Sequence, residues 1–227
     1  MLLKIAIKNL FGARLRSFLN IFVTSLSFFI IIFISGMYDG MRKHAKQVTI
    51  KSEAGGGAYW HPKYNPMDPM LFEQSHSQVP LKLSSLIEQK KAVSVLVSQV
   101  TIYPNGRMMP VIMKGISPDQ SVVEMPTDML MGHEEIYLPV IIGKTMAKNA
   151  KLQIGDSFTI RWLDKDKTYD ANEATIVHIM DTENFKIDIG HIWVPIDRAR
   201  EMLSMKKAML LSVDTVMVDS RNLNQTT

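Results

Sequence analysis

Residues 18–38 read FLNIFVTSLSFFIIIFISGMY, and this stretch decides how the rest of the chain is organised. It holds 21 residues and no formal charge. A helix of this length spans about 30 Å at roughly 1.5 Å per residue, which is the thickness of a bilayer core. The stretch therefore predicts a transmembrane helix over residues 18–38.

A cleaved signal peptide is the main alternative for this stretch. Its apolar region usually covers about 7–15 residues and precedes a small-residue cleavage site. The stretch here is longer and ends in Gly36-Met37-Tyr38-Asp39. A buried helix of a soluble protein fits less well, because the stretch is dense in β-branched and aromatic residues. The sequence favours a helix that is retained in the membrane.

The predicted helix has a polar side. At 100° per residue, four small or polar side chains fall within about 80° of one another. They are Asn20, Thr24, Ser27 and Ser35. Such side chains favour contacts between helices in lipid, so we interpret them as a face that packs against other transmembrane helices. The alternative is that the hydroxyl groups bond back to the backbone of their own helix.

Residues 1–17 form an amphipathic, basic stretch before the span. Its basic residues are Lys4, Lys8, Arg14 and Arg16, and residues 1–38 contain no acid. This pattern predicts an interfacial helix on the anionic inner surface of the membrane, with membrane lipid as a partner. It also favours a cytoplasmic N-terminus, although basic residues follow the span closely as well.

The net charge of +4 lies entirely in this N-terminal part, because the remainder of the chain has equal numbers of acidic and basic residues. A nucleic-acid-binding domain would spread a basic face over its folded surface, so this class is excluded. The chain has no Cys. Disulfides, thiolate nucleophiles and thiolate metal sites are therefore excluded too.

Residues 39–227 predict an α+β domain of strands and short helices on the far side of the membrane. Residues 39–52 are expected to continue the helix and then enter a strand near 48–50, and 53–80 are expected to form a long Gly- and Pro-rich loop. Helices are predicted at 81–90, 143–150 and 196–204. Strands are predicted at 93–103, 108–116, 135–138, 156–163, 174–181, 192–194 and 212–219, the first two joined as a hairpin.

No catalytic constellation is present in the sequence. The six His residues lack the spacing of a helical zinc site, and neither a P-loop nor a G-x-S-x-G motif occurs. We therefore expect no catalytic residue, cofactor or metal in this chain. The 17 Met residues are expected mainly to fill the core, the alternative being a surface for apolar ligands.

Several short motifs resemble the MacB/FtsX-type permeases of ABC transporters, which include the LolC/LolE lipoprotein-releasing proteins. The opening Ala6–Leu10 and Arg14–Ser17 precede the span, as in that family. Ile141–Lys144 with Ala147, followed by Leu152–Asp156, resembles its "G-x-x-x-A … L-x-x-G-D" passage. His191–Pro195 resembles its strand–Pro–helix passage. Residues 56–64 are reminiscent of the LolE-like entry.

This resemblance implies a role as the permease subunit of an ABC transporter in the bacterial inner membrane. It implies a periplasmic core domain like that of MacB, three further helices after it and no enzymatic activity of its own. A separate ABC ATPase subunit and a second permease copy or paralogue would be its partners. The cargo would be a lipoprotein or another apolar molecule, released or exported by mechanical transmission.

Two other function classes were weighed. A single-span membrane-anchored sensor or binding protein would use the Asn20 face for homodimerisation. A membrane-tethered hydrolase is disfavoured, because the sequence supplies neither a nucleophile with its base nor a set of metal ligands.

Overall fold

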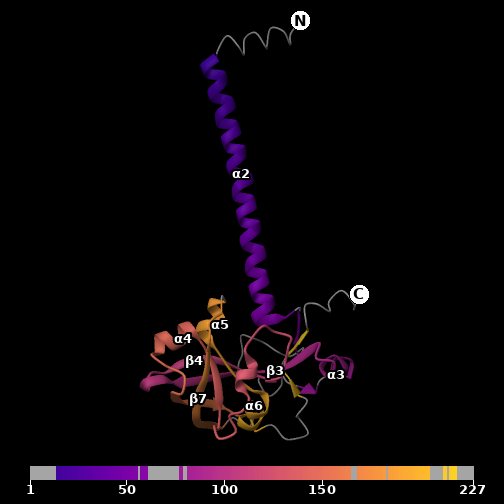
Figure 1. Cartoon of the computed structure of the whole chain (residues 1–227), viewed down its shortest axis with the longest axis vertical. Coiled ribbons are helices and arrows are strands. Elements are labelled where there is room, and N and C mark those ends of the chain that lie inside the picture. Colours follow the sequence, from indigo (N-terminus) through magenta and orange to yellow (C-terminus); the bar gives the residue numbers. More distant parts are fainter. Residues whose placement is uncertain are drawn as a thin grey trace. The chain divides into compact units, whose positions relative to one another are not determined.

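The computed structural model describes residues 14–55, 57–60, 77–78, 81–164, 168–182, 184–204, 212–213 and 215–218. The chain divides into two compact units, Met1–Gln47 and Val48–Thr227. Figure 1 shows both, and each is described by itself below.

The first unit is dominated by the helix α2, Arg14–Thr49, which contains the whole predicted span. The π-helical turn η1, Ile50–Ala54, follows it directly. The strand predicted near residues 48–50 is therefore wrong. Local hydrogen bonding prolongs the helical winding, since the Ser52 hydroxyl donates to the Val48 carbonyl at 2.7 Å. Gly55 then ends it with φ 56° and ψ −137°, a conformation that side chains disfavour.

The second unit mixes strands with short helices, which confirms the α+β class. Its strands are β1 (Gly57–Trp60), β2 (Ser77–Gln78), β3 (Ala92–Tyr103), β4 (Met109–Ile116), β5 (Pro139–Gly143), β6 (Ser157–Leu163), β7 (Tyr169–Met180), β8 (His191–Pro195), β9 (Ser212–Val213) and β10 (Thr215–Val218). Its helices are α3 (Leu81–Glu88), α4 (Lys144–Ala150), α5 (Phe185–Gly190) and α6 (Ile196–Met202), with 3₁₀ turns η3 (Pro104–Gly106) and η4 (Thr127–Leu130).

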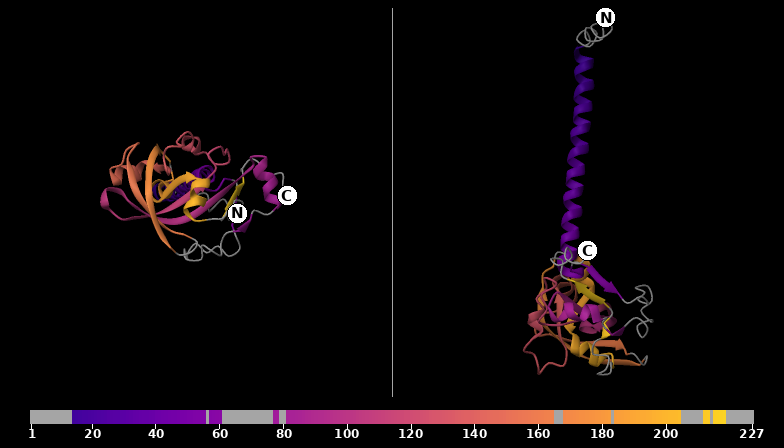
Figure 2. Two further views of the ribbon diagram at one scale, coloured as in Figure 1. Left: turned by 90° about the horizontal axis from the view of Figure 1, so that it is seen from below. Right: turned by 90° about the vertical axis from the view of Figure 1, so that its right-hand side faces the viewer.

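Eight strands form one mixed sheet in the order β1-β10-β3-β4-β8-β5-β7-β6. The pairs β4–β8 and β5–β7 are parallel, and the other pairs are antiparallel. The last strand, β6, also pairs with the end of β3, at Thr101↔Arg161 and its neighbours. Six strands therefore close into a barrel, from which β10 and β1 extend. Figure 2 shows the curved sheet from two further directions.

The larger hydrophobic cluster fills the inside of this barrel. All six strands contribute to it, with Ile102, Val111, Ile142, Ile160, Ile176 and Ile192 as examples. Helices α4 and α6 add buried residues to the same cluster, among them Met146 and Ala199. Gly115 of β4 permits the close approach of α6, because a Cβ there would lie 2.6 Å from the Cβ of Ala199. The barrel is thus a packed core.

A second cluster covers the outer face of the same strands. It contains Val95, Ile141 and Trp193 from the sheet, together with residues of the connection 117–138 and of α5. Both faces of the central strands are therefore buried, since all of β5 and the first four residues of β8 are buried. This double burial explains why these strands are almost continuously apolar.

Some predicted boundaries were wrong. Residues 135–138 form turns, and the strand predicted there is β5, four residues later. Pro139 starts it, a position at which a strand tolerates proline. The helix α5 was not predicted. The expected loop 53–80 contains β1 and β2 in its described part.

Candidate functional site: the membrane helix and the domain motifs

The apolar stretch of α2 is exposed along its length. The continuous helical segment Leu15–Ser52, which joins α2 to most of η1, is the one helix in the described part of the chain that is long and apolar enough to cross a membrane. Its most apolar 18 residues have a mean hydropathy of 2.3, and none of them is buried against the described residues. So many large apolar side chains are stable only when lipid or other helices surround them. The helix is therefore the candidate functional element of the first unit.

The predicted polar face lies along one side of α2. The Thr24 hydroxyl donates to the Asn20 carbonyl and the Ser27 hydroxyl donates to the Val23 carbonyl, each at 2.8 Å. These are the hydrogen bonds to the backbone of the same helix that the alternative interpretation expects. They satisfy the two hydroxyl donors and leave the oxygen lone pairs and the Asn20 amide for contacts with another helix. Packing through Asn20, Thr24, Ser27 and Ser35 thus stays a prediction.

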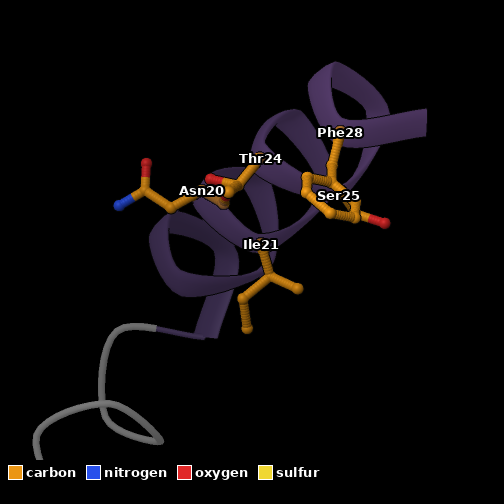
Figure 3. Close-up of a pocket in the computed structure, with 5 residues that line it drawn as sticks. All are labelled: Asn20, Ile21, Thr24, Ser25 and Phe28. Atoms are coloured by element: carbon orange, nitrogen blue, oxygen red, sulfur yellow. The ribbon is translucent and has the colours of Figure 1, made fainter. Parts of the chain in front are cut away.

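A shallow hollow follows the same side of the helix. Asn20, Ile21, Thr24, Ser25 and Phe28 line it, and all come from α2. Figure 3 shows the five side chains on neighbouring turns of α2. A hollow formed by a single helix encloses no ligand, but its small side chains would admit the side chain of a neighbouring helix.

The predicted membrane-surface residues are only partly described. Lys4 and Lys8 lie outside the described residues. Arg14 begins α2, and the side chain of Arg16 is exposed. Whether residues 1–17 lie on the membrane surface therefore stays a prediction.

The turn after α2 is fastened to the rest of the second unit. The backbone N–H of Glu124 donates to the Lys51 carbonyl at 2.8 Å, and Lys51 Nζ lies 3.2 Å from a Glu124 carboxylate oxygen. The exposed ion pair contributes little by itself, about 0–1 kcal/mol. The backbone bond fixes η1 to the connection after β4. This contact was not predicted, because it joins residues 73 positions apart.

The motif Gly143-x-x-x-Ala147 has a packing reason. Gly143 ends β5, and a Cβ there would clash with the backbone of Asp188 in α5. The buried Asp188 carboxylate accepts a hydrogen bond from the Thr145 N–H at 3.0 Å and so caps the first turn of α4. Ala147 lies on the buried side of α4. The motif therefore serves the junction of β5, α4 and α5.

The passage Leu152–Asp156 forms the turn from α4 to β6. The N–H of Leu152 donates to the Ala147 carbonyl at 2.9 Å. Gly155 has φ 92°, and its N–H donates to the Ile176 carbonyl at 2.8 Å. The Asp156 carboxylate accepts a bond from the Gln153 N–H at 2.7 Å. Glycine and aspartate at these positions are explained by the geometry of the turn.

The passage His191–Pro195 is the buried strand β8. Trp193 is fully buried, and the Nζ atom of Lys114 lies 4.9 Å from the centre of its ring. Pro195 ends the strand and precedes the first residue of α6, where a fixed φ suits a helix start. This passage builds the core and exposes no reactive group.

The described residues hold no group of three or more His, Cys, Asp or Glu side chains arranged to bind a metal ion. The suggestive His133-Glu134-Glu135 lies on exposed turns. The methionines are divided: Met113 and Met146 are buried, whereas Met108, Met129 and Met131 are exposed. Core filling therefore describes part of the set, and a Met surface for apolar ligands stays a prediction.

Comparisons with known proteins give structural likenesses only. No family model and no curated protein matches the chain. The extracellular domain of YknZ, a noncanonic ABC-type transporter from Gram-positive bacteria, matches 74% of this chain and 84% of its own length, with 13% identity and a TM-score of 0.42. A domain of a permease protein from Porphyromonas gingivalis matches 56% of this chain and 55% of its own length, with 10% identity and a TM-score of 0.31. TM-scores below 0.5 do not establish a common fold.

Proposed function

We propose that the chain belongs to a permease subunit of an ABC transporter in the bacterial inner membrane. Its span would carry the α+β unit on the periplasmic side. ATP hydrolysis by a partner ATPase in the cytoplasm would move this unit by way of the helix, so that cargo is released or exported.

The observation that carries this proposal is the apolar helix α2. It is long enough to cross a bilayer, its apolar side chains are exposed, and it ends at the first residues of a separately packed α+β unit. The order of the motifs supports it too, since the span, Gly143–Ala147, Leu152–Asp156 and His191–Pro195 follow one another as in MacB/FtsX-type permeases. A mechanical role needs a stiff connection and two arrangements of the domain, and it needs no reacting side chain.

A polar face on the span fits assembly with other helices. We propose that Asn20, Thr24, Ser27 and Ser35 contact further transmembrane helices of the same subunit or of a second permease copy or paralogue. The Asn20 amide is the strongest candidate contact, because a polar group in lipid gains from a partner across the helix interface. The cargo would be a lipoprotein or another apolar molecule.

The test is purification of the full-length protein from membranes in mild detergent, followed by mass spectrometry of its partners. Recovery of an ABC ATPase in near-stoichiometric amount is the expected result. Recovery of the protein alone, or only with copies of itself, would contradict the permease and favour the membrane-anchored sensor.

A matched pair of variants sharpens this test. Asn20→Leu is expected to lower the recovery of partner subunits, because the amide contact is lost. Phe22→Leu changes a bulky side chain on the opposite side of α2 and serves as the control. Equal recovery from both variants would show that the Asn20 face is not a subunit contact.

A further inference from the structure

A half-open pocket of about 330 Å³, called the cavity below, lies on the second unit. The end of α3, the start of β3, the connection 117–122 and α6 line it. Pockets for small molecules begin at about 300 Å³, so this one has the size for a single small ligand. Its lining has an aliphatic part, a cationic part and an acidic part.

The aliphatic part forms one wall. Its residues are Ile87, Ala92, Val93, Val122 and Ile196, of which the last four are buried. Such a wall stabilises an apolar group that leaves water by roughly 0.8 kcal/mol per buried CH₂. It favours a ligand with a short aliphatic side chain.

The cationic part is Arg200. Its side chain is only 12% exposed, and its Nη1 donates to an Asp197 carboxylate oxygen at 3.2 Å. Its Nε is buried and has no hydrogen-bond partner among the described residues. Burial lowers the pKa of Arg200 from its usual range, and Asp197 acts in the opposite direction. A ligand carboxylate would give the guanidinium a second charge-assisted partner beside Asp197.

The acidic part exceeds the cationic part. Lys90 pairs with Asp119 at 3.0 Å, and Asp119 also accepts a bond from the Ser117 hydroxyl at 2.6 Å. Glu88 is exposed and has no ion-pair partner among the described residues. Three acids and two bases line the cavity, which leaves one negative charge in excess. This excess opposes a simple anion and favours a ligand that also carries a cation.

We propose that this cavity binds an aliphatic α-amino acid. The carboxylate of the ligand pairs with Arg200, its ammonium group faces Glu88, and its side chain packs on the aliphatic wall. The three parts of the lining thus match the three parts of one zwitterionic molecule. The inference is independent of the proposed transport function, since it concerns a site within the second unit alone.

Isothermal titration of the full-length protein in detergent tests it with three related probes. Leucine carries both charges, leucinamide lacks the carboxylate, and 4-methylpentanoate lacks the ammonium group. Saturable binding of leucine, at least tenfold tighter than that of either analogue, is expected. The proposal is overturned by an absence of saturable leucine binding, or by an analogue that binds as tightly as leucine.

Two variants test the assigned contacts. Arg200→Gln and Glu88→Gln are each expected to weaken leucine binding at least tenfold. Arg198→Gln is the matched control, because Arg198 lies on the same helix and pairs with Glu201 outside the cavity, at 3.0 Å. Should Arg200→Gln fail to fold, the exposed Glu88→Gln decides the question. Unchanged leucine affinity in Glu88→Gln contradicts the assignment.

Discussion

The span of α2 and the closed sheet of the second unit are both strongly apolar, yet their side chains meet opposite surroundings. Phe28 of α2 is 66% exposed, whereas Trp193 of β8 is 0% exposed. In the sheet, apolar residues are covered by strands, by helices and by the connection 117–138. The helix has no such cover among the described residues. The apolar residues of the sheet are therefore surrounded by protein, and those of the span are suited to lipid or to other helices.

The patterns of the two regions also differ. Strand β6 alternates between exposed and buried residues, because one of its faces lies inside the barrel. The apolar residues of α2 are exposed on every side. A helix that exposes apolar side chains on all sides, beside one narrow polar face, requires a largely apolar environment. The comparison teaches that the order of apolar and polar residues indicates whether a segment is surrounded by protein or by lipid, whereas the apolar content alone does not.

The largest effect is expected from truncating the core tryptophan. Trp193→Ala should lower the free energy of unfolding of the second unit by about 3–5 kcal/mol, because it leaves a cavity in the outer cluster. Urea unfolding of the full chain in detergent, followed by tryptophan fluorescence, measures it. Phe28→Ala in the span is the control and should leave this transition unchanged. Equal effects of the two substitutions would remove the distinction between the regions.

A charge in the middle of the span should oppose membrane insertion. Ile31→Lys is expected to cost about 3 kcal/mol of insertion free energy. Extraction of membranes with alkaline carbonate measures it, and the variant should move to the soluble fraction in part. Ile154→Lys places the same charge on an exposed turn of the second unit and should remain with the membrane. Full retention of Ile31→Lys would show that this residue does not face lipid or a tightly packed helix.

The two buried tryptophans allow a finer test inside the core. Trp162 Nε1 donates to the Met202 carbonyl at 2.6 Å, whereas Trp193 Nε1 has no partner among the described residues. Trp162→Phe should therefore cost about 1–3 kcal/mol for a carbonyl left unpaired, and Trp193→Phe should cost less. Thermal unfolding of the two variants compares them. A larger loss of stability in Trp193→Phe than in Trp162→Phe would contradict the assignment of the hydrogen bond to Trp162 alone.

The smallest effect concerns pH. The Ser117 hydroxyl and the Lys90 ammonium group lower the pKa of Asp119 below its usual 3.8. A depressed folded-state pKa contributes stability above the unfolded pKa, and this contribution is lost as pH falls from about 4 through the folded value. Because the pair is exposed, the loss should be only a few tenths of a kcal/mol. Urea unfolding of the parent and of Asp119→Asn at pH 6 and pH 3 measures it. A larger loss of unfolding free energy between pH 6 and pH 3 in Asp119→Asn than in the parent would contradict this role of Asp119.

Much of the fold was predictable from local patterns. The uncharged stretch predicted α2, and the Val-rich alternation around Pro104-Asn105-Gly106 predicted the β3–β4 hairpin. The failures have physical causes. Helix α5 has only six residues, too few for a periodic signal. Closure of the barrel depends on β3 meeting β6 at Thr101↔Arg161, residues far apart in the sequence.

The sites were less predictable than the fold. The polar face of α2 with Asn20 and Thr24 follows from the helical period alone, and its role in packing stays a prediction. The cap that Asp188 provides to α4 joins residues 43 positions apart. Glu88 and Arg200 line one pocket although they are far apart in the sequence, because α3 and α6 both pack against β3. Contacts of this kind carry no local signal in a single sequence.

The most direct test of the central claim is whether the residues before the span and the α+β unit lie on opposite sides of the membrane. The chain contains no Cys, so single cysteines report without background. Asn9→Cys and Thr159→Cys, in spheroplasts treated with a membrane-impermeant maleimide, mark the two sides. We predict labelling of Thr159→Cys in intact spheroplasts and of Asn9→Cys only after permeabilisation. Labelling of both, or of Asn9→Cys alone, before permeabilisation would contradict a membrane-spanning helix that places the α+β unit outside the cytoplasm.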